Sequence, residues 1–311
     1  MKKLVSPDGT AAGRFAFGTM QFGGRADEAA SRAMYDACRA AGITHFDTAY
    51  VYTDGASETL LGKMIQTERD RLLIATKAGY VGGSSAANMA EQFEVSRQRL
   101  GLDMVDVLYL HHFDPASDLR DTIEGFARLK QAGLIRYVGL SNMAAWQVMK
   151  AIRIAAEFDL EIDILQPMYN LVKRQAEVEI LPMSTDQGLA VAPYSPLGGG
   201  LLTGKYASGQ GGRLKDDARY ARRYGEDWMY RTAEDLAVLA AEIGANPATL
   251  AAAWVAAHPD GPMPILSARS AGQLAPSLAA IDFEMTPELY ARLSALSPTP
   301  PPATDRTEER G

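Results

Sequence analysis

Four side chains in the first half of the chain have types that together could protonate a carbonyl oxygen. Asp47 and Tyr52 lie close together in HFDTAYVYTDG, Lys77 ends the run RLLIATK, and His111 ends VDVLYLH. A free tyrosine has a pKa of about 10 and is a poor proton donor at neutral pH. A nearby ammonium lowers that pKa, a carboxylate holds the ammonium, and an imidazole can hydrogen-bond a substrate oxygen. Together they would form a general acid beside a site that polarises a carbonyl.

Each of these residues, taken alone, has an ordinary explanation. An Asp after a strand is commonly a turn former or helix cap, a lone Lys is commonly solvated, and a His in the pair at 111–112 is commonly structural. The chemistry therefore depends on a fold that brings the four together. Reduction of a carbonyl also needs a hydride, which no side chain supplies and a nicotinamide cofactor does.

Eight short apolar runs alternate with helix-period segments along the chain. The runs are residues 14–20, 43–49, 71–77, 105–111, 135–141, 162–168, 189–195 and 263–268. Several are almost continuously apolar, which is typical of parallel strands covered on both faces. The pattern predicts an α/β protein, a single-domain (β/α)8 TIM barrel over residues 1–297, with a doubly wound sheet as the alternative. In such a barrel the chemistry lies at the C-terminal ends of the strands.

The two ends of the chain have a different character. Residues 1–13 carry the turn signal PDG and are predicted to form a hairpin. Residues 298–311 are rich in proline and charge and are predicted to be a flexible tail.

Composition narrows the class of partner. The chain has 311 residues, 47% of them hydrophobic, and a net charge of −7, which argues against binding to a nucleic acid. No apolar run reaches the length of about 18 residues that a membrane span needs, and the N-terminus lacks the apolar core of a secretion signal. Four histidines and one cysteine, without an H-E-x-x-H motif, predict no metal site. We therefore expect a cytoplasmic protein that acts on a small molecule, with its oligomeric state left open.

Over about residues 14–281 the chain resembles the aldo-keto reductase family. HFDTAYVYTDGASETLLG is similar to that family's first signature, ATK matches its lysine, and VDVLYLHHFD places His111, not His112, at its histidine. The resemblance implies that Tyr52 donates a proton, Lys77 lowers its pKa, Asp47 holds Lys77 and His111 orients the carbonyl. It is closest to the branch with a long loop after strand seven, which includes bacterial reductases, sugar dehydrogenases and potassium-channel β subunits.

The same resemblance implies a site for NADPH. Motifs in the later strands and loops match the family's cofactor segments: GTM (Gly18, Thr19, Met20), GLSN (Ser141, Asn142), QPMYN (Gln166) and PYSPLGGGLLTGKY (Tyr194, Ser195, Pro196, Leu197, Gly198, Gly200, Lys205). Ser141, Asn142 and Gln166 would hold the carboxamide, Tyr194 would lie under the nicotinamide, and the glycine-rich stretch would wrap the pyrophosphate. Asp47 would border the cofactor as well.

The last strand carries the residues that would select NADPH over NADH. In ILSARSAGQLAPS, Arg269 matches the family's ligand for the 2′-phosphate, with Ser267, Ser270 and Gln273 around it. An Arg on the surface beside helix-capping residues is the alternative. The chain departs from the family at Pro276 and Ser277, where a Glu-Asn pair commonly contacts adenine. The glycines at 198–200 lack the third glycine of a Rossmann fingerprint, which disfavours a Rossmann dehydrogenase.

The favoured hypothesis is an NADPH-dependent oxidoreductase that reduces an aldehyde or ketone to an alcohol. A sugar or polyol dehydrogenase using the same site is the alternative, and a cofactor-binding regulatory subunit is a third. The substrate is expected to be a small carbonyl compound or sugar. Trp146 and Trp254 are interpreted as packing residues, and RYARRYGEDWMY as an exposed charged helix.

Overall fold

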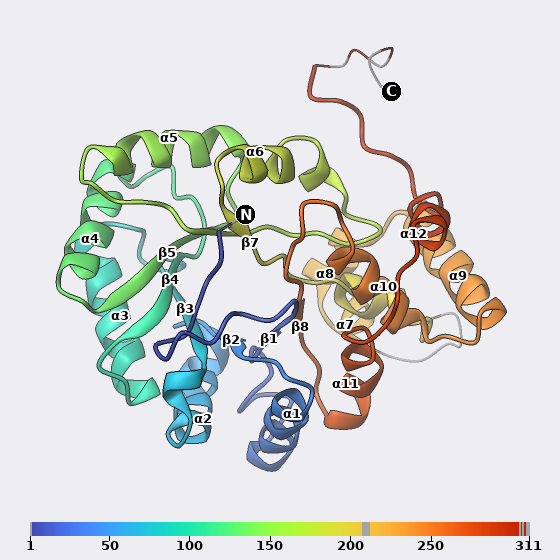
Figure 1. Ribbon diagram of the computed structural model, residues 1–311, viewed down its shortest axis with the longest axis horizontal. Helices are drawn as coiled ribbons and strands as arrows, with labels where there is room; N and C mark the ends of the chain where they lie inside the picture. The colour runs from blue at the N-terminus through green and yellow to red at the C-terminus, as the bar shows by residue number, and fades with distance from the viewer. Residues whose placement is uncertain (1, 207–211, 305, 307, 309–311) are drawn as a thin grey trace.

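A ring of eight parallel strands forms the centre of the molecule (Figure 1). The computed structural model describes residues 2–206, 212–304, 306 and 308. The strands adjoin in the order β7-β6-β5-β4-β3-β2-β1-β8. They are β1 (Ala16–Gly18), β2 (His45–Asp47), β3 (Leu73–Ala78), β4 (Val105–Leu110), β5 (Ile135–Ser141), β6 (Ile164–Gln166), β7 (Ala190–Val191) and β8 (Ile265–Leu266). Each lies within one of the eight apolar runs, except that β3 extends one residue past its run, to Ala78.

Backbone hydrogen bonds close this sheet into a barrel. The N–H of Met263 donates to the Val191 carbonyl at 2.8 Å, and the N–H of Ile265 donates to the Pro193 carbonyl at 2.9 Å. The chain at and just after β7 is therefore paired with the β8 segment, which already pairs with β1. The predicted (β/α)8 barrel is confirmed, and the doubly wound sheet is excluded because an open sheet has two free edges.

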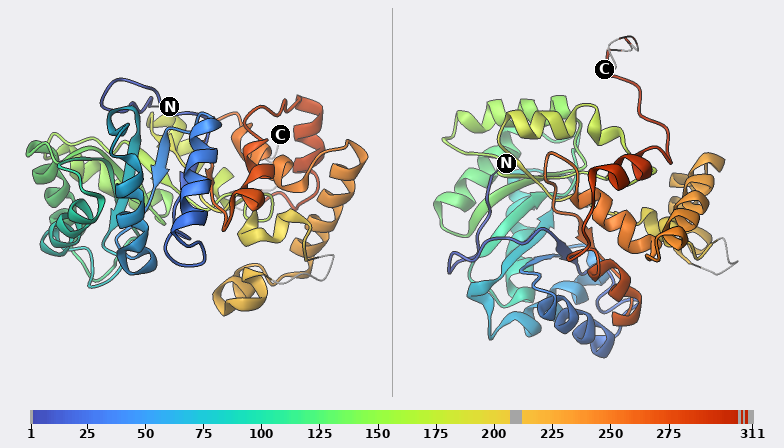
Figure 2. Two further views of the ribbon diagram at one scale, coloured as in Figure 1. Left: turned by 90° about the horizontal axis from the view of Figure 1, so that it is seen from below. Right: turned by 45° about the vertical axis from the view of Figure 1, so that its right-hand side comes forward.

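Helices surround the barrel and follow the strands in alternation (Figures 1 and 2). The α-helices are α1 (Glu28–Ala40), α2 (Ala56–Ile65), α3 (Ala86–Leu100), α4 (Leu119–Gln131), α5 (Ala145–Ala156), α6 (Ile180–Asp186), α7 (Arg213–Asp216), α8 (Ala218–Arg223), α9 (Asp227–Glu242), α10 (Pro247–Ala256), α11 (Ala271–Leu278) and α12 (Pro287–Ser294). Four 3-10 helices are η1 (Tyr52–Gly55), η2 (Arg69–Arg71), η3 (Gln175–Glu177) and η4 (Gly198–Thr203). Polar caps start several of them; Asp27, for example, accepts a hydrogen bond from the N–H of Ala30 at the start of α1.

The N-terminal hairpin closes one end of the barrel. Val5 and Ala11 form an antiparallel bridge around the turn, as the PDG signal predicts. Leu4 is buried and packs against apolar side chains that fill the barrel interior, among them Leu73, Val107 and Ile164. The opposite end of the barrel is not covered by the hairpin, and Figure 2 shows α7 and α8, in gold, on that opposite side.

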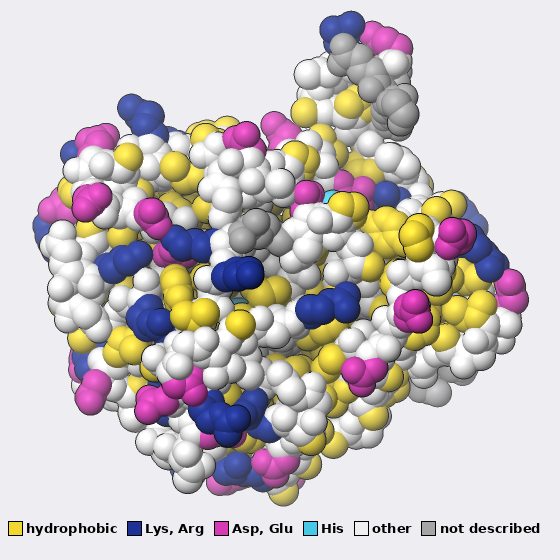
Figure 3. Space-filling model, in the orientation of Figure 1, with side chains coloured by type: hydrophobic (Ala, Val, Ile, Leu, Met, Phe, Trp, Pro, Cys, Tyr) yellow, Lys and Arg dark blue, Asp and Glu magenta, His cyan; other side chains and the backbone are white. Residues whose placement is uncertain are grey.

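Charged side chains are interspersed on the face that carries the hairpin. Figure 3 shows Lys and Arg alternating there with Asp and Glu. Among the described residues no single helix is long and apolar enough to cross a membrane; α9 and α10 meet that test only jointly, as a pair bent by 102°.

The C-terminal segment after α12 leads away from the barrel (Figure 1). Residues 298–304 contain no helix or strand. Of the predicted flexible tail, residues 305, 307 and 309–311 lie outside the described residues, and its flexibility and the domain boundary at residue 297 stay predictions.

Candidate active site

The four side chains singled out by their chemistry meet at the open end of the barrel. Asp47 is the last residue of β2, Lys77 is the penultimate residue of β3, and His111 directly follows β4. Neighbouring parallel strands end at the same side of a sheet, so the fold brings these residues together. Tyr52 enters from η1, the 3-10 helix after β2.

Lys77 is the centre of this cluster. Its side chain is 1% exposed, and its Nζ is ion-paired with Asp47, donates to the Thr48 carbonyl at 2.7 Å, and donates to the Tyr52 hydroxyl at 3.4 Å. These three acceptors match the three protons of an ammonium. Burial by itself lowers the pKa of Lys77, but the Asp47 carboxylate and the Tyr52 oxygen outweigh burial and the pKa is raised. The Lys77 side chain is therefore a fixed positive charge beside the phenol.

The phenol of Tyr52 stays protonated at neutral pH. Burial raises its pKa above the ordinary value, and the positive charge of Lys77 opposes the rise without reversing it. The sequence argument included the effect of Lys77 and omitted the cost of removing a phenolate from water. The net pKa shift of Tyr52 is thus opposite to the expected one, although Lys77 contributes in the expected direction.

His111 contributes a neutral imidazole. Burial, with help from the charges of Lys77 and His112, lowers its pKa to about 3. Its ring lies edge-on to the Tyr52 ring, with centroids 5.9 Å apart. A neutral ring can exchange hydrogen bonds with a substrate oxygen without adding a second positive charge.

A chain of hydrogen bonds extends from this cluster to the loop after β7. Gln166 Nε2 donates to Asp47 Oδ2 at 2.8 Å, and Ser141 Oγ donates to the Gln166 carbonyl at 3.0 Å. Asn142 Nδ2 donates to Ser141 Oγ at 3.1 Å, and Tyr194 OH donates to Asn142 Oδ1 at 2.6 Å. The residues expected around a carboxamide are thus tied directly to the residues expected to carry out catalysis.

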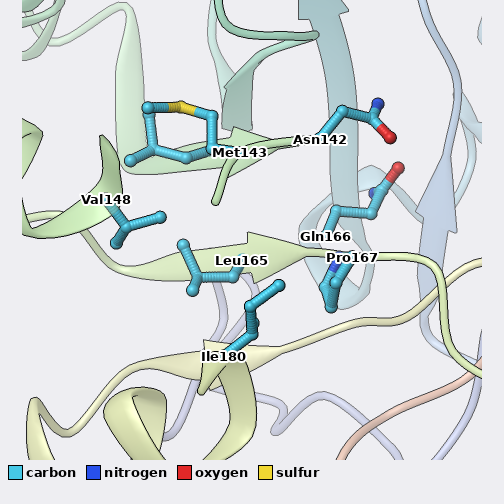
Figure 4. Close-up of a pocket in the computed structure, with 8 residues that line it drawn as sticks. Asn142, Met143, Val148, Leu165, Gln166, Pro167 and Ile180 are labelled. Carbon is cyan, nitrogen blue, oxygen red and sulfur yellow. The ribbon is translucent and has the colours of Figure 1, made fainter. Parts of the chain in front are cut away.

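A small pocket lies behind this chain of residues (Figure 4). Its lining comes from the ends of β5 and β6 and from α5 and α6: Leu140, Asn142, Met143, Val148, Leu165, Gln166, Pro167 and Ile180. Figure 4 shows the amides of Asn142 and Gln166 at one end of the pocket and apolar side chains at the other. Both amides already bond within the protein: Asn142 Nδ2 also donates to the His111 carbonyl at 2.9 Å, and Gln166 Nε2 donates to Asp47.

The turn after β1 contacts the cluster next to Asp47. Thr19 is fully buried, and its Oγ1 contacts the Asp47 carbonyl at 3.1 Å and Ser57 Oγ at 2.8 Å. A Cβ at Gly18 would lie 2.9 Å from a methyl of Ile265, while Met20 is partly exposed. Gly18, Thr19 and Met20 are the three predicted cofactor contacts in this turn. Of these, the Thr19 side chain already makes its hydrogen bonds within the protein.

The loop after β7 contains several residues with positive φ. Ser195 has a φ of 59°, and Gly198 and Gly200 have φ of 56° and 99°, with Pro196 and Leu197 between them. A Cβ at Gly200 would lie 2.9 Å from Lys205 Nζ, so the loop folds back and places this ammonium against its own backbone. The N–H groups of Gly198 and Gly200 donate to the Ser195 and Leu197 carbonyls within the loop, so the feature that the loop offers a phosphate here is the nearby ammonium.

Arg269 lies between β8 and α11, near the same loop. Burial raises the pKa of Tyr206, and the charge of Arg269 acts against this rise. Ser270 caps α11 by accepting from the N–H of Gln273, whose Oε1 accepts from the N–H of Arg269. The capping alternative therefore holds for Ser270 and Gln273, while Ser267 is exposed and the Arg269 side chain is partly exposed.

Of Pro276 and Ser277, the two positions where the chain departs from the expected Glu-Asn pair, Ser277 is buried and Pro276 is partly exposed. The Pro276 carbonyl accepts from Thr249 Oγ1 at 2.6 Å, and Ser277 is 1% exposed. These positions are used for packing α11 on α10, so recognition of a dinucleotide would depend on Arg269 and Lys205.

Two features of the rim were missed by the sequence argument. Tyr220 on α8 lies against the glycine-rich loop after β7, because a Cβ at Gly199 would lie 2.8 Å from its ring. Residues 219–230, which were predicted to form an exposed charged helix, are therefore exposed on one side only. Tyr220 and Tyr224 lie one helical turn apart, and this spacing indicates the inner face. Tyr80, after β3, is 48% exposed, and its ring lies 4.8 Å from that of His111.

The interpretation of Trp146 as a packing residue is wrong. Trp146 is 63% exposed, and its ring lies 6.1 Å from that of Phe113 at the rim. The buried face of α5 consists of Ala145, Val148, Ala151, Ile154 and Ala155, and Trp146 shares the outward face with Lys150. Trp254 is fully buried, as predicted.

Comparison with known proteins gives a consistent result. The family model described as "Aldo/keto reductase family" matches residues 14–298. The chain is 32% identical over 305 residues to a "Probable voltage-gated potassium channel subunit beta" of Oryza sativa subsp. japonica, covering 91% of this chain and 92% of that protein. It is 31% identical to the "Uncharacterized oxidoreductase YrpG" of Bacillus subtilis (strain 168), covering 92% of this chain and 93% of that protein. It is 39% identical over 195 residues to the human "Aflatoxin B1 aldehyde reductase member 2", covering 61% of this chain and 54% of that protein.

Proposed function

The chain belongs to the aldo/keto reductase family, and from that premise we propose that it is an NADPH-dependent reductase of aldehydes or ketones with Tyr52 as the proton donor. Membership makes it an oxidoreductase of this type; the cofactor, the direction and the roles of the residues are the proposal. The observation that carries it is the contact of a buried, charged Lys77 with the Tyr52 hydroxyl at 3.4 Å, beside the neutral ring of His111.

Each side chain of the cluster around Lys77 would have its own role in the reduction. As a carbonyl carbon is reduced, negative charge develops on its oxygen, and a donor positioned for that charge lowers the barrier. His111 would hydrogen-bond this oxygen, and the Tyr52 hydroxyl would transfer its proton to the oxygen. Lys77 would stabilise the phenolate that remains, and Asp47 with the Thr48 carbonyl would hold Lys77 in place.

A bound nicotinamide dinucleotide would supply the hydride. Asn142 and Gln166 would hold its carboxamide, and Tyr194, fixed by its hydrogen bond to Asn142, would form the platform beneath the ring. The positive-φ loop from Ser195 to Gly200 would follow the pyrophosphate, and Lys205 and Arg269 would bind phosphate at the far end. The positive φ angles of this loop and the Lys205 ammonium beside Gly200 support this part of the proposal.

The proposed function is tested by titration and turnover. Tyrosine and tryptophan fluorescence should be quenched by NADPH at lower concentrations than by NADH, and aldehydes should then be reduced at the expense of NADPH. The apolar rim formed by Tyr80, Phe113 and Trp146 suggests that aldehydes with an apolar or aromatic part belong in the panel. Tight binding of NADPH with negligible turnover on every carbonyl compound would favour a regulatory subunit instead, the possibility that the similarity to potassium-channel β subunits raises.

Replacing Arg269 with methionine should selectively weaken the binding of NADPH. Hydrogen bonds to a charged group are worth roughly 1.5–3 kcal/mol, so we expect its Kd to rise about 10- to 100-fold while the Kd of NADH stays within about twofold. Fluorescence titration measures both. Arg292→Met is the matched control, since Arg292 pairs with Glu242 on the surface. An equal loss for both cofactors would show that Arg269 does not recognise the 2′-phosphate.

The pH dependence should differ between reduction and oxidation. Reduction needs the Tyr52 phenol protonated, and because burial raises its pKa above the usual ~10, kcat/KM should be flat from about pH 6 to about pH 9. Oxidation of the alcohol needs the phenolate, so its kcat/KM should rise about tenfold per pH unit over that range. The neutral His111, with a pKa of about 3, should add no step to either profile.

Parallel initial-rate profiles in the two directions check this prediction. A break in the reduction profile near neutral pH would mean that His111 titrates there. An oxidation rate that levels off below about pH 9 would mean that Lys77 lowers the pKa of Tyr52 more than burial raises it, and would favour the alternative of a sugar or polyol dehydrogenase.

A further inference from the structure

The segment directly after Tyr52 has a strained backbone. Thr53 and Asp54 have φ of 49° and 53°, and Gly55 has a φ of 91°, so three consecutive residues are left-handed. For residues other than glycine this conformation costs roughly 1–2 kcal/mol each. Such strain persists only where surrounding contacts hold the backbone in place. The contacts that hold this segment therefore also set the position of the phenol.

Arg99, in the last turn of α3, provides contacts on both sides of Tyr52. Its Nη1 donates to the Tyr50 carbonyl at 2.9 Å, and its Cζ lies 4.8 Å from the centroid of the Tyr50 ring. On the other side, a Cβ at Gly55 would lie 2.4 Å from Arg99 Cζ. The guanidinium thus rests against the backbone of Gly55, where only a glycine leaves room for it and also accepts the left-handed φ.

Buried Glu58 fixes this guanidinium relative to the strand that carries Lys77. Glu58 is fully buried, accepts from Arg99 Nη1 at 3.1 Å through Oε2, and accepts from Thr76 Oγ1 at 2.6 Å through Oε1. Thr76 is the neighbour of Lys77 on β3. A second anchor connects the segment to the turn after β1, since Thr53 Oγ1 donates to the Phe22 carbonyl at 2.7 Å.

We propose that Arg99 is a positioning residue for the Tyr52 phenol: clamped by Glu58, it holds residues 50–55 in the strained shape that places this hydroxyl within reach of Lys77. The inference rests on the proposed role of Tyr52 as proton donor. Without the guanidinium, residues 53–55 relax toward lower-energy backbone angles and the phenol moves away from the ammonium. A misplacement of about 1 Å can lower a rate about 10²-fold.

The test compares Arg99→Met with Arg97→Met, both in the full-length protein. Arg97 lies on the same helix, pairs with Glu94 and donates to the Asp103 carbonyl at 2.8 Å, so its replacement removes the same charge without touching residues 50–55. We expect Arg99→Met to lower kcat for aldehyde reduction about 10²-fold, with KM and the Kd of NADPH within about threefold of wild type. The solvent deuterium isotope effect on kcat should rise, because proton transfer becomes slower. Arg97→Met should retain wild-type values.

A double-variant comparison distinguishes positioning from general damage. If Arg99 acts through the phenol, Arg99→Met should lower the residual turnover of Tyr52→Phe by no more than about twofold. Arg99→Lys keeps the charge without the forked geometry and should recover part of kcat. Glu58→Gln, which leaves the guanidinium without its carboxylate, should lose kcat in the same way. An equal fold loss with and without the Tyr52 hydroxyl would overturn the proposal.

Hydrogen exchange provides a readout that needs no turnover. In Arg99→Met the amides of residues 50–58 should exchange at least about tenfold faster than in wild type and in Arg97→Met, corresponding to a loss of roughly 1.4 kcal/mol of local protection. If Arg99→Met does not fold, the same comparison is made with Arg99→Lys and Glu58→Gln. Unchanged exchange would overturn the role of Arg99, whereas a wild-type protein that reduces no carbonyl compound would overturn the proposed function alone.

Discussion

Replacing Tyr52 with phenylalanine is expected to lower kcat for aldehyde reduction about 10³-fold, because a positioned general acid contributes roughly 10²- to 10⁴-fold. The change removes one oxygen and keeps the ring, so the edge-on contact with His111 and the packing of Lys77 over the ring should persist. The Kd of NADPH should stay within about twofold of wild type. Steady-state kinetics and fluorescence titration on the same preparation measure both quantities.

The control for this variant is another tyrosine that loses its hydroxyl far from the site. Tyr137 lies on β5, and its hydroxyl accepts from the N–H of Val5 in the N-terminal hairpin at 3.3 Å, at the opposite end of the barrel, so Tyr137→Phe should retain wild-type turnover. In Tyr52→Phe, the loss of the Tyr52 hydroxyl should also remove the pH dependence of alcohol oxidation, since no phenolate can form at that position. Turnover of Tyr52→Phe within about tenfold of wild type would mean that another group donates the proton, and His111 would then be the next candidate because its ring contacts the same space.

The barrel could be predicted because its strands coincide with almost continuous apolar runs. The lengths of these strands could not be predicted. β5 has the predicted bounds, Ile135–Ser141. β7 and β8 retain two residues each. Pro264 directly precedes β8 and Pro193 lies two residues after the end of β7. Both lack the N–H that a continuing ladder needs, so the pairing there is reduced to isolated contacts such as Tyr194 with Ile265.

The cluster around Lys77 could be predicted for a topological reason. Parallel strands end on one side, so Asp47, Lys77 and His111 had to approach one another once the barrel was assigned. Arg99 and Glu58 gave no such signal: they lie on helices α3 and α2, outside the strand ends, and their pairing depends on how those helices pack. Tyr220 belongs to a short helix in a long connection, where periodicity alone does not reveal which element it covers.

The electrostatics of the site depend on burial, which spacing does not give. A Lys beside a Tyr predicts a lowered phenol pKa, and the structure contains that contact, but exclusion of water from Tyr52 has the larger effect. The same balance makes His111 neutral. Both groups are therefore in the protonation state that suits reduction, which is a property of the folded chain and not of its motifs.

Replacing Lys77 with methionine is expected to damage both stability and activity. The Asp47 side chain is 3% exposed and relies on the Lys77 ammonium, so the variant leaves a buried carboxylate without its cation. Removing one partner of a buried ion pair costs roughly 3–5 kcal/mol in the free energy of unfolding. Aldehyde reduction should fall at least about 10³-fold, because no positive charge then stabilises the phenolate. Urea unfolding with an unchanged slope, together with steady-state rates, measures the two effects.

The pairing can be separated from the catalytic effect by a second substitution. In Lys77→Met combined with Asp47→Asn the uncompensated carboxylate is gone, while an amide oxygen still accepts from Gln166 Nε2. Most of the stability lost in Lys77→Met comes from the buried, unpaired Asp47 carboxylate, and less comes from the loss of its attraction to the ammonium. The double variant should therefore recover most of the lost stability. Its turnover should remain as low as that of Lys77→Met, since the charge beside Tyr52 is still missing. If the double variant were less stable than Lys77→Met, the ammonium would be stabilising the barrel through its bond to the Thr48 carbonyl, and the proposed hold of Asp47 on Lys77 would be secondary.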